Sequence, residues 1–400
     1  DNLKVRASYG ILGNQLLTAD DWKGNTKYYP YIPFMSSGSA DKWLFTNTEK
    51  SLYINPAGLV SNSLTWEKAS TVNVGLDVTL LQQKLDMSFD WYQRTTSDML
   101  VKVEYPEILG TTAPPANMAA LRTRGWELSV NWNDRIGKDF TYSLGLILSD
   151  SQAEITKYTN KNGTLSDHYV GEKIGEIWGY ETEGFYQNED DVANHADQSK
   201  LGSNWAPGDI MYKDLDESGK IDNGSNTLDD HGDLKVIGNT TPRYQYGITA
   251  NMSYKNVYMN IFFQGIGKRD YWPSSQPFWP VATQYYNTQK WFVTDSWSED
   301  NRDAYFPRPI ARETKNQQKQ TKYLQDASYC RLKNLSVGYD FPVTWLGFLR
   351  ISKASIYFSA ENLFEFTNVK GAYDPEAAGK NGTMVYPFQR TYSFGLNVTF

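Results

Sequence analysis

The chain of 400 residues is poor in cysteine and histidine and has no long apolar run. Cys330 is the single cysteine, so a disulfide within the chain is excluded. No stretch of about 18 consecutive apolar residues occurs, which excludes a membrane-spanning helix. The 46 Asp and Glu outnumber the 39 Lys and Arg, and the net charge of −7 argues against nucleic acid as a partner.

Catalytic motifs are also missing. The three histidines, His168, His195 and His231, show no zinc-like spacing, and we expect solvated loop residues. Neither a nucleophile arrangement nor a glycine-rich phosphate loop is present, so we predict that the chain is not an enzyme. A glycosidase-type pair of carboxylates is left open, because Asp and Glu are common throughout. The first residues resemble the middle of a strand and not a signal peptide. We therefore expect the chain to be a piece of a longer protein.

Aromatic residues, in contrast, are abundant: 28 Tyr, 18 Phe and 13 Trp make up 15% of the chain. Many lie in segments where apolar and polar residues alternate, as in the terminal run that ends at Phe400. Alternation of this kind gives a strand one apolar and one polar face. It recurs at 3–11, 72–80, 85–91, 126–132, 140–148, 244–252, 257–263, 335–341, 356–360 and 392–400.

The connections between these segments alternate between short and long. The long ones cover about residues 12–64, 103–120, 154–241, 269–325 and 367–388. Outer-membrane β-barrels show this alternation of loop lengths, with tight periplasmic turns and long outer loops. A soluble β-sandwich would explain the alternation within strands, but its loops have no reason to alternate in length. The sequence therefore predicts an all-β, transmembrane antiparallel barrel wall with long extracellular loops.

One acidic motif matches the first nine positions of an EF-hand calcium loop. Its candidate ligands are Asp214, Asp216, Ser218, Lys220 through its carbonyl, and Asp222, and Gly219 supplies the turn. The twelfth position, where a bidentate Glu is expected, is Ser225, so Asp229 or Asp230 would have to replace that ligand. The motif predicts a Ca²⁺ site, and an acidic turn without metal is the alternative.

The connection 269–325 is rich in aromatic side chains that could stack on sugar rings or contact a partner protein. The alternative is that these rings pack the connection onto itself. We take as candidates for contact with substrate or with a covering protein Trp272, Trp279, Tyr285, Tyr286 and Trp291.

Several segments together resemble the SusC-like (SusC/RagA-type) TonB-dependent outer-membrane transporters of Bacteroidetes. The resemblance rests on Asp326–Tyr339, Ser359–Thr367 with Gly371–Glu376, Ala206–Asp222, Val236–Tyr244 and Leu3–Gln15. These segments span nearly the whole chain in family order.

The resemblance implies a barrel of about 22 strands, of which this chain would supply the last ten. It implies TonB-dependent import of oligosaccharides, or alternatively oligopeptides, together with a SusD-like lipoprotein lid. The plug domain, the TonB-contacting segment and the other strands would lie upstream. Phe400 would be the aromatic terminal signal read during outer-membrane assembly. From a different class, a surface β-rich carbohydrate-binding or adhesin module remains an alternative, and a barrel enzyme would need a catalytic constellation.

Overall fold

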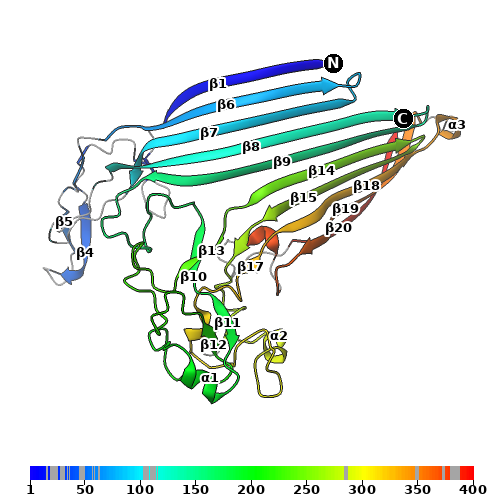
Figure 1. Ribbon diagram of the computed structural model, residues 1–400. Coiled ribbons are helices and arrows are strands. Elements are labelled where there is room, and N and C mark those ends of the chain that lie inside the picture. Colours follow the sequence, from blue (N-terminus) through cyan, green and yellow to red (C-terminus); the bar gives the residue numbers. More distant parts are fainter. Residues whose placement is uncertain are drawn as a thin grey trace.

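The computed structural model describes residues 1–14, 17–18, 26–27, 32–33, 35, 37–44, 50–55, 57, 59–61, 64–101, 108, 114, 116–282, 287–346, 351–371, 374–378 and 388–400. One antiparallel sheet of ten strands dominates the fold, and its spatial order follows the chain (Figure 1). Its strands are β1 (Asn2–Asn14), β6 (Glu67–Leu80), β7 (Leu85–Val101), β8 (Ala116–Ile136), β9 (Phe140–Lys157), β14 (Arg243–Tyr254), β15 (Val257–Lys268), β18 (Tyr329–Asp340), β19 (Lys353–Thr367) and β20 (Thr391–Thr399). The predicted all-β antiparallel wall is thereby confirmed.

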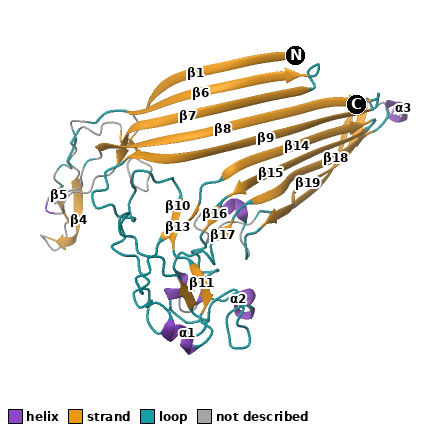
Figure 2. Cartoon of the chain, viewed as in Figure 1, coloured by secondary structure: helices purple, strands orange, loops and turns teal. Residues whose placement is uncertain are grey.

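Short elements occupy the long connections and the link between β18 and β19 (Figure 2). The paired short strands are β2 (Leu17–Thr18) with β3 (Thr26–Lys27), β4 (Ser37–Leu44) with β5 (Lys50–Ile54), β10 (Glu176–Gly179) with β13 (Lys235–Asn239), β11 (Thr182–Phe185) with β12 (Ile210–Tyr212), and β16 (Asp270–Tyr271) with β17 (Gln325–Asp326). The helices are α1 (Glu189–Asn194), α2 (Lys290–Thr294), α3 (Val343–Leu346) and the 3₁₀ turns η2 (Pro280–Ala282), η3 (Lys315–Gln317) and η5 (Pro375–Ala377). In the described part of the chain, every helix is too short or too polar to cross a membrane.

The alternation in sequence gives the sheet an apolar face and a polar face. Cross-strand register aligns apolar residues in rows, and one row contains Val5, Leu76, Phe89, Leu128 and Leu148. No described part of the chain forms a layer over these outward side chains, and at the edge strand Phe394 is 83% exposed. Such a face requires an apolar solvent, which the hydrocarbon of a bilayer supplies.

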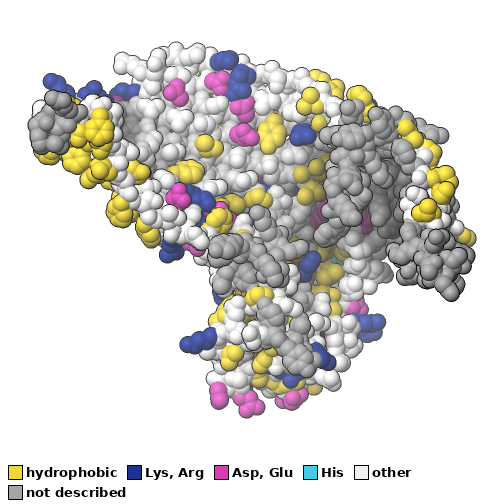
Figure 3. All heavy atoms as spheres, turned by 180° about the vertical axis from the view of Figure 1, so that it is seen from behind, with side chains coloured by type: hydrophobic (Ala, Val, Ile, Leu, Met, Phe, Trp, Pro, Cys, Tyr) yellow, Lys and Arg dark blue, Asp and Glu magenta, His cyan; other side chains and the backbone are white. Residues whose placement is uncertain are grey.

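The polar face carries charges that are paired with one another. Arg6 of β1 donates to Asp77 of β6 at 2.8 Å and to Asp90 of β7 at 2.8 Å. Figure 3 shows side chains of both charge signs gathered on the upper strands and on the lower lobe. Polar residues on one face and apolar residues on the other match a barrel wall between water and lipid.

Tight turns close one end of the sheet, and both chain termini lie at that same end (Figure 1). The turn between β6 and β7 holds Leu81, Gln82 and Gln83 at φ of 57°, 59° and 67°. In the two-residue turn between β14 and β15, Lys255 has a φ of 54°. In tight hairpins, residues with positive φ give the turn a backbone twist that matches the twist of the two flanking strands.

Tyrosine rings cover glycines on neighbouring strands. Each tyrosine lies directly opposite a glycine in the register, so the ring fills the space that a Cβ would occupy. The pairs are Tyr92 with Gly125, Tyr246 with Gly265, Tyr258 with Gly338, and Tyr357 with Gly395. These pairs fix strand register, because shifting a strand by one residue would place each ring against a side chain.

The long strands extend further than the sequence predicts. β8 begins at Ala116 and β9 runs to Lys157, so the sheet includes residues that the sequence places in the connections 103–120 and 154–241. The pattern misses these ends because their outward residues, such as Arg124 and Gln152, are polar. β7, β8 and β9 therefore continue beyond the apolar band as a polar wall.

Candidate functional site

The connections 158–242 and 269–328 fold together into a lobe at the open end of the sheet, which we call the loop domain (Figure 1). β11 and β12 come from the first connection, whereas α2 and η3 come from the second. Its core is an aromatic cluster drawn from both connections: Tyr180, Phe185, Ile210, Tyr212, Ile221, Phe278, Trp279, Phe292, Trp297, Ala304, Phe306 and Tyr323. The two connections therefore form one folded unit and not two separate loops.

A buried ionic node joins the two connections. Asp209, which is fully buried, accepts hydrogen bonds from Arg308 Nε at 2.9 Å and from Asn316 Nδ2 at 2.9 Å. Lys315 Nζ lies 3.0 Å from the same carboxylate, and this ammonium also lies 4.8 Å above the Trp205 ring. Since buried charges require partners, these residues hold the loop domain in one arrangement. Sequence patterns do not reveal this node, because its members are about a hundred residues apart.

The acidic motif forms a tight turn within the loop domain. Asp214 accepts a hydrogen bond from the backbone N–H of Gly219 at 2.8 Å, and Asp216 accepts one from Ser218 N at 3.0 Å. Gly219 has a φ of 76°, as the sharp turn requires. The Lys220 carbonyl instead accepts from the Ser218 hydroxyl at 2.9 Å.

The structure adds Asp233 to this motif. Carboxylate oxygens of Asp214, Asp216 and Asp233 all lie within 4.8 Å of one another. Asp233 is fully buried and accepts from Leu215 N at 2.6 Å and from Asp222 N at 2.9 Å. Burial raises the pKa of Asp233, and the nearby negative charges of Asp216 and Asp214 raise it further. Hydrogen bonds from Ser218 lower the pKa of Asp216.

Asp230, one of the two substitutes expected from the sequence, binds Ser225 at the motif's twelfth position. Its carboxylate accepts from the Ser225 hydroxyl at 2.6 Å. Asp222 likewise directs a carboxylate oxygen to Gly224 N at 2.7 Å. Of the five predicted ligands, the structure thus brings the carboxylates of Asp214 and Asp216 together, and Asp233 completes the group. The cluster of hard oxygen donors fits calcium, and binding stays a prediction.

The aromatic candidates on the second connection occupy different positions. Trp279 is 4% exposed and packs edge-to-face on Tyr323 at 4.9 Å between ring centroids, so the expectation of an exposed stacking ring is wrong for Trp279. Trp272 and Trp291 are half-buried against the same core. Their contact with substrate or with a covering protein stays a prediction, whereas Tyr285 and Tyr286 lie outside the described residues.

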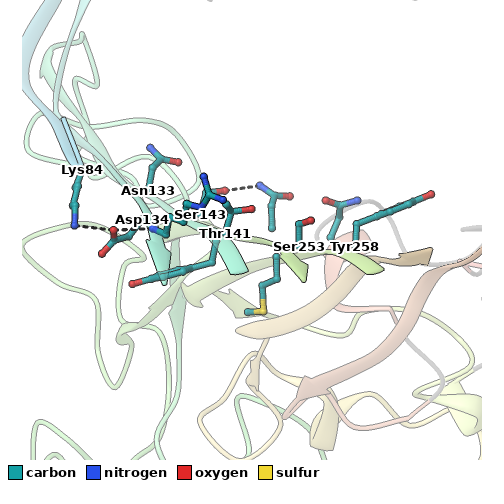
Figure 4. Close-up of a pocket in the computed structure, with 12 residues that line it drawn as sticks. Lys84, Asn133, Asp134, Thr141, Ser143, Ser253 and Tyr258 are labelled. Carbon is teal, nitrogen blue, oxygen red and sulfur yellow. Dashed lines mark hydrogen bonds and ion pairs between the residues drawn. The ribbon is translucent and has the colours of Figure 1, made fainter. Parts of the chain in front are cut away.

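A hollow of about 580 Å³ lies on the polar face near the tight turns (Figure 4). Neutral hydrogen-bonding side chains dominate its lining, including Asn133, Ser143, Asn251 and Ser253. Asn251 Nδ2 donates to Ser143 Oγ at 3.0 Å, and Lys84 at the rim pairs with Asp134 at 2.8 Å. The polar wall is therefore suited to contact water, a polar ligand or another polar protein segment.

The connection after β19 is anchored to the wall by a second buried cation. Arg331 of β18 is 2% exposed and binds Glu365 of β19, Asp374 at 2.8 Å and Glu376 at 2.6 Å. Its guanidinium also lies 5.1 Å from the centroid of the Phe388 ring. At the end of β20, Phe400 is exposed, and its role as an assembly signal stays a prediction.

Comparison with known proteins identifies the family. A family model described as TonB dependent receptor-like, beta-barrel matches residues 1–363. The TonB-dependent receptor P3 of Formosa agariphila is 30% identical over 99% of this chain, and the TonB-dependent receptor SusC of Bacteroides thetaiotaomicron is 26% identical over 100%. These alignments cover 39% and 38% of those relatives, so the chain spans about two fifths of their length.

Solved structures share the fold. The structure of the RagAB peptide transporter superposes with a TM-score of 0.73 over 100% of this chain and 41% of that chain, at 24% identity. The ten-stranded sheet thus shares its fold with part of that chain. The chain therefore belongs to the TonB-dependent receptor-like β-barrel family, is similar to SusC, and is an outer-membrane protein.

Proposed function

We propose that this chain forms the C-terminal barrel wall and outer loops of a TonB-dependent transporter that imports a nutrient across the outer membrane. The observation that carries the proposal is the family match over residues 1–363, on a sheet with one apolar and one polar face. Among the strands that the structure describes, β1 pairs with β6 alone and β20 with β19 alone, and unpaired strand edges are unstable in lipid. We propose that further strands complete the barrel, and that a plug domain covers its polar face.

The loop domain is proposed to dock a SusD-like surface lipoprotein that closes over the barrel. Its support is the folded core, since a rigid surface at the open end of the barrel can be recognised without an ordering cost. In this arrangement the half-buried rings of Trp272 and Trp291 would contact the lipoprotein or the cargo. Energy for import would come through the TonB complex acting on the plug.

The cargo is proposed to be an oligosaccharide. Once the plug moves aside, the amides and hydroxyls on the polar face, such as Asn133 and Ser143, would offer the donors and acceptors that sugar hydroxyls require. An oligopeptide is the alternative cargo, because the same polar groups can bind peptide backbones. Membership of a barrel receptor family argues against the adhesin alternative.

We also propose that Asp214, Asp216 and Asp233 bind Ca²⁺ and thereby rigidify the loop domain. The proximity of their carboxylates supports this, and bound calcium would offset the repulsion among them. Calcium here would act on structure, at a site separate from cargo transport.

The test uses the complete transporter purified together with its SusD-like lipoprotein from the native outer membrane. Affinities for a panel of oligosaccharides and for a pool of oligopeptides are measured on this pair. Binding of one oligosaccharide class supports the proposal. Binding of peptides alone would replace the cargo, and failure of any lipoprotein to co-purify would contradict the lid.

A further inference from the structure

The apolar face of the sheet ends at a sharp level on β8. Outward-facing side chains from Ile136 to Trp126 are mainly apolar, and the next outward residues are Arg124 and Arg122. Ten residues of strand span about 34 Å, which a tilt of about 40° reduces to about 26 Å across the membrane. This matches the apolar band of about 25 Å in outer-membrane barrels. Trp126 therefore marks the outer limit of the lipid hydrocarbon.

The neighbouring strand places a second aromatic ring at this limit. Trp91 of β7 lies directly opposite Trp126, and one step further out Gln93 lies opposite Arg124. Tryptophan is typical of the boundary between hydrocarbon and lipid headgroups. Arg124 consequently lies at headgroup level on the face that contacts lipid.

The arginines near this level differ in their partners. Arg122 pairs with Glu154 at 3.0 Å, and Arg243 pairs with Asp150. Arg124 is exposed, and its Nε donates to the neutral Gln93 Oε1 at 2.7 Å. Within the described residues, no carboxylate lies within ion-pair distance of Arg124. Its positive charge therefore remains uncompensated by the described part of the protein.

We propose that Arg124 binds the phosphate group of an outer-leaflet lipid. The guanidinium binds phosphate through two parallel N–H···O bonds, and the bond from Nε to Gln93 holds the group in place while leaving its terminal nitrogens available. Charge complementarity favours this occupant, because phosphate is the anion that a membrane presents at headgroup level. The inference rests on the proposed orientation, in which the long connections are extracellular.

The experiment measures binding of phosphorylated lipid A and of enzymatically dephosphorylated lipid A to the complete transporter in detergent. Arg124→Gln is expected to weaken binding of the phosphorylated lipid about tenfold and to leave binding of the dephosphorylated lipid unchanged. Arg94→Gln is the matched control, since Arg94 is exposed at nearly the same height on the polar face of β7. Arg124→Lys keeps the charge but cannot form the two parallel bonds, so it should retain only part of the affinity.

Several outcomes would overturn the proposal. These are equal affinity of the wild-type protein for the two lipids, equal losses in the Arg124→Gln and Arg94→Gln variants, or inorganic phosphate binding as tightly as the lipid. The comparison of the two lipids on the wild-type protein is decisive even where a variant fails to fold. This experiment does not measure cargo uptake. If the transporter bound lipid as expected but did not import cargo, that result would contradict the proposed function and leave the lipid proposal intact.

Discussion

Replacement of Asp209 by asparagine should loosen the loop domain without disturbing the barrel wall. The Asp209 carboxylate contacts Arg308 at 2.8 and 2.9 Å and Lys315 at 3.0 Å, and Lys315 is 2% exposed. The Asp209→Asn variant would keep the shape of the side chain but leave Lys315 buried without its counter-ion. Removal of one partner from a buried ion pair costs about 3–5 kcal/mol.

This cost should appear as local opening. At about 1.4 kcal/mol per tenfold change, the open population of the loop domain should rise about 100- to 4,000-fold. Hydrogen exchange on the complete transporter measures this rise for amides in β11, β12 and the aromatic core. Asp197→Asn is the control, because Asp197 is exposed and its side chain bonds only locally to Ser199.

Two results would refute the reasoning about Asp209. Unchanged exchange in the loop domain would show that the ionic node does not hold the two connections together. Equal acceleration in the barrel strands would show that the loop domain and the wall do not open independently. Lipoprotein binding, measured on the same variant, should weaken in parallel with the opening if the loop domain is the docking surface.

Three further predictions concern the wall, the acidic motif and the last connection. Gly338→Ala would place a Cβ 2.6 Å from Tyr258 Cε1, which should destabilise the wall by about 1–3 kcal/mol and slow the formation of the heat-resistant barrel in gel-shift assays. A second substitution, Tyr258→Ala, should restore assembly. If it does not, the tyrosine–glycine pairs do not fix strand register. Asp233→Ala should abolish calcium binding in calorimetry, and Asp230→Asn should not. Calcium affinity should also fall as the pH is lowered, because burial raises the pKa of Asp233 and protonation of its carboxylate removes a ligand. Arg331→Met leaves three carboxylates without their shared cation, so proteolysis of the connection 368–390 should accelerate. If the variant resists protease as well as the wild type does, Arg331 does not anchor this connection.

The strands of the sheet could be predicted because lipid on one side and water on the other enforce strict alternation. Val72 to Leu80 and Leu85 to Trp91 show this pattern clearly, and both segments lie in the sheet. Where strands leave the membrane, neither solvent enforces the pattern. The outer ends of β8 and β9 around Arg124 and Gln152 therefore resemble connections in the sequence.

The site was harder to predict because its contacts join distant segments. Local spacing indicates Asp214 and Asp216, but Asp233 reaches them only through the fold of the loop domain. Trp279 resembles a surface ring in the sequence because its burial depends on Tyr323 and the other core residues of both connections. Sequence patterns report local geometry, whereas these burials depend on tertiary packing.

The most direct test of the account is uptake of labelled oligosaccharides and oligopeptides by cells that carry the complete transporter. We predict accumulation of one oligosaccharide class. This accumulation should be lost when the transporter gene or the TonB gene is deleted, and when a protonophore collapses the inner-membrane gradient. Uptake of that cargo that persists without TonB, or that is unchanged without the transporter, would contradict the central claim.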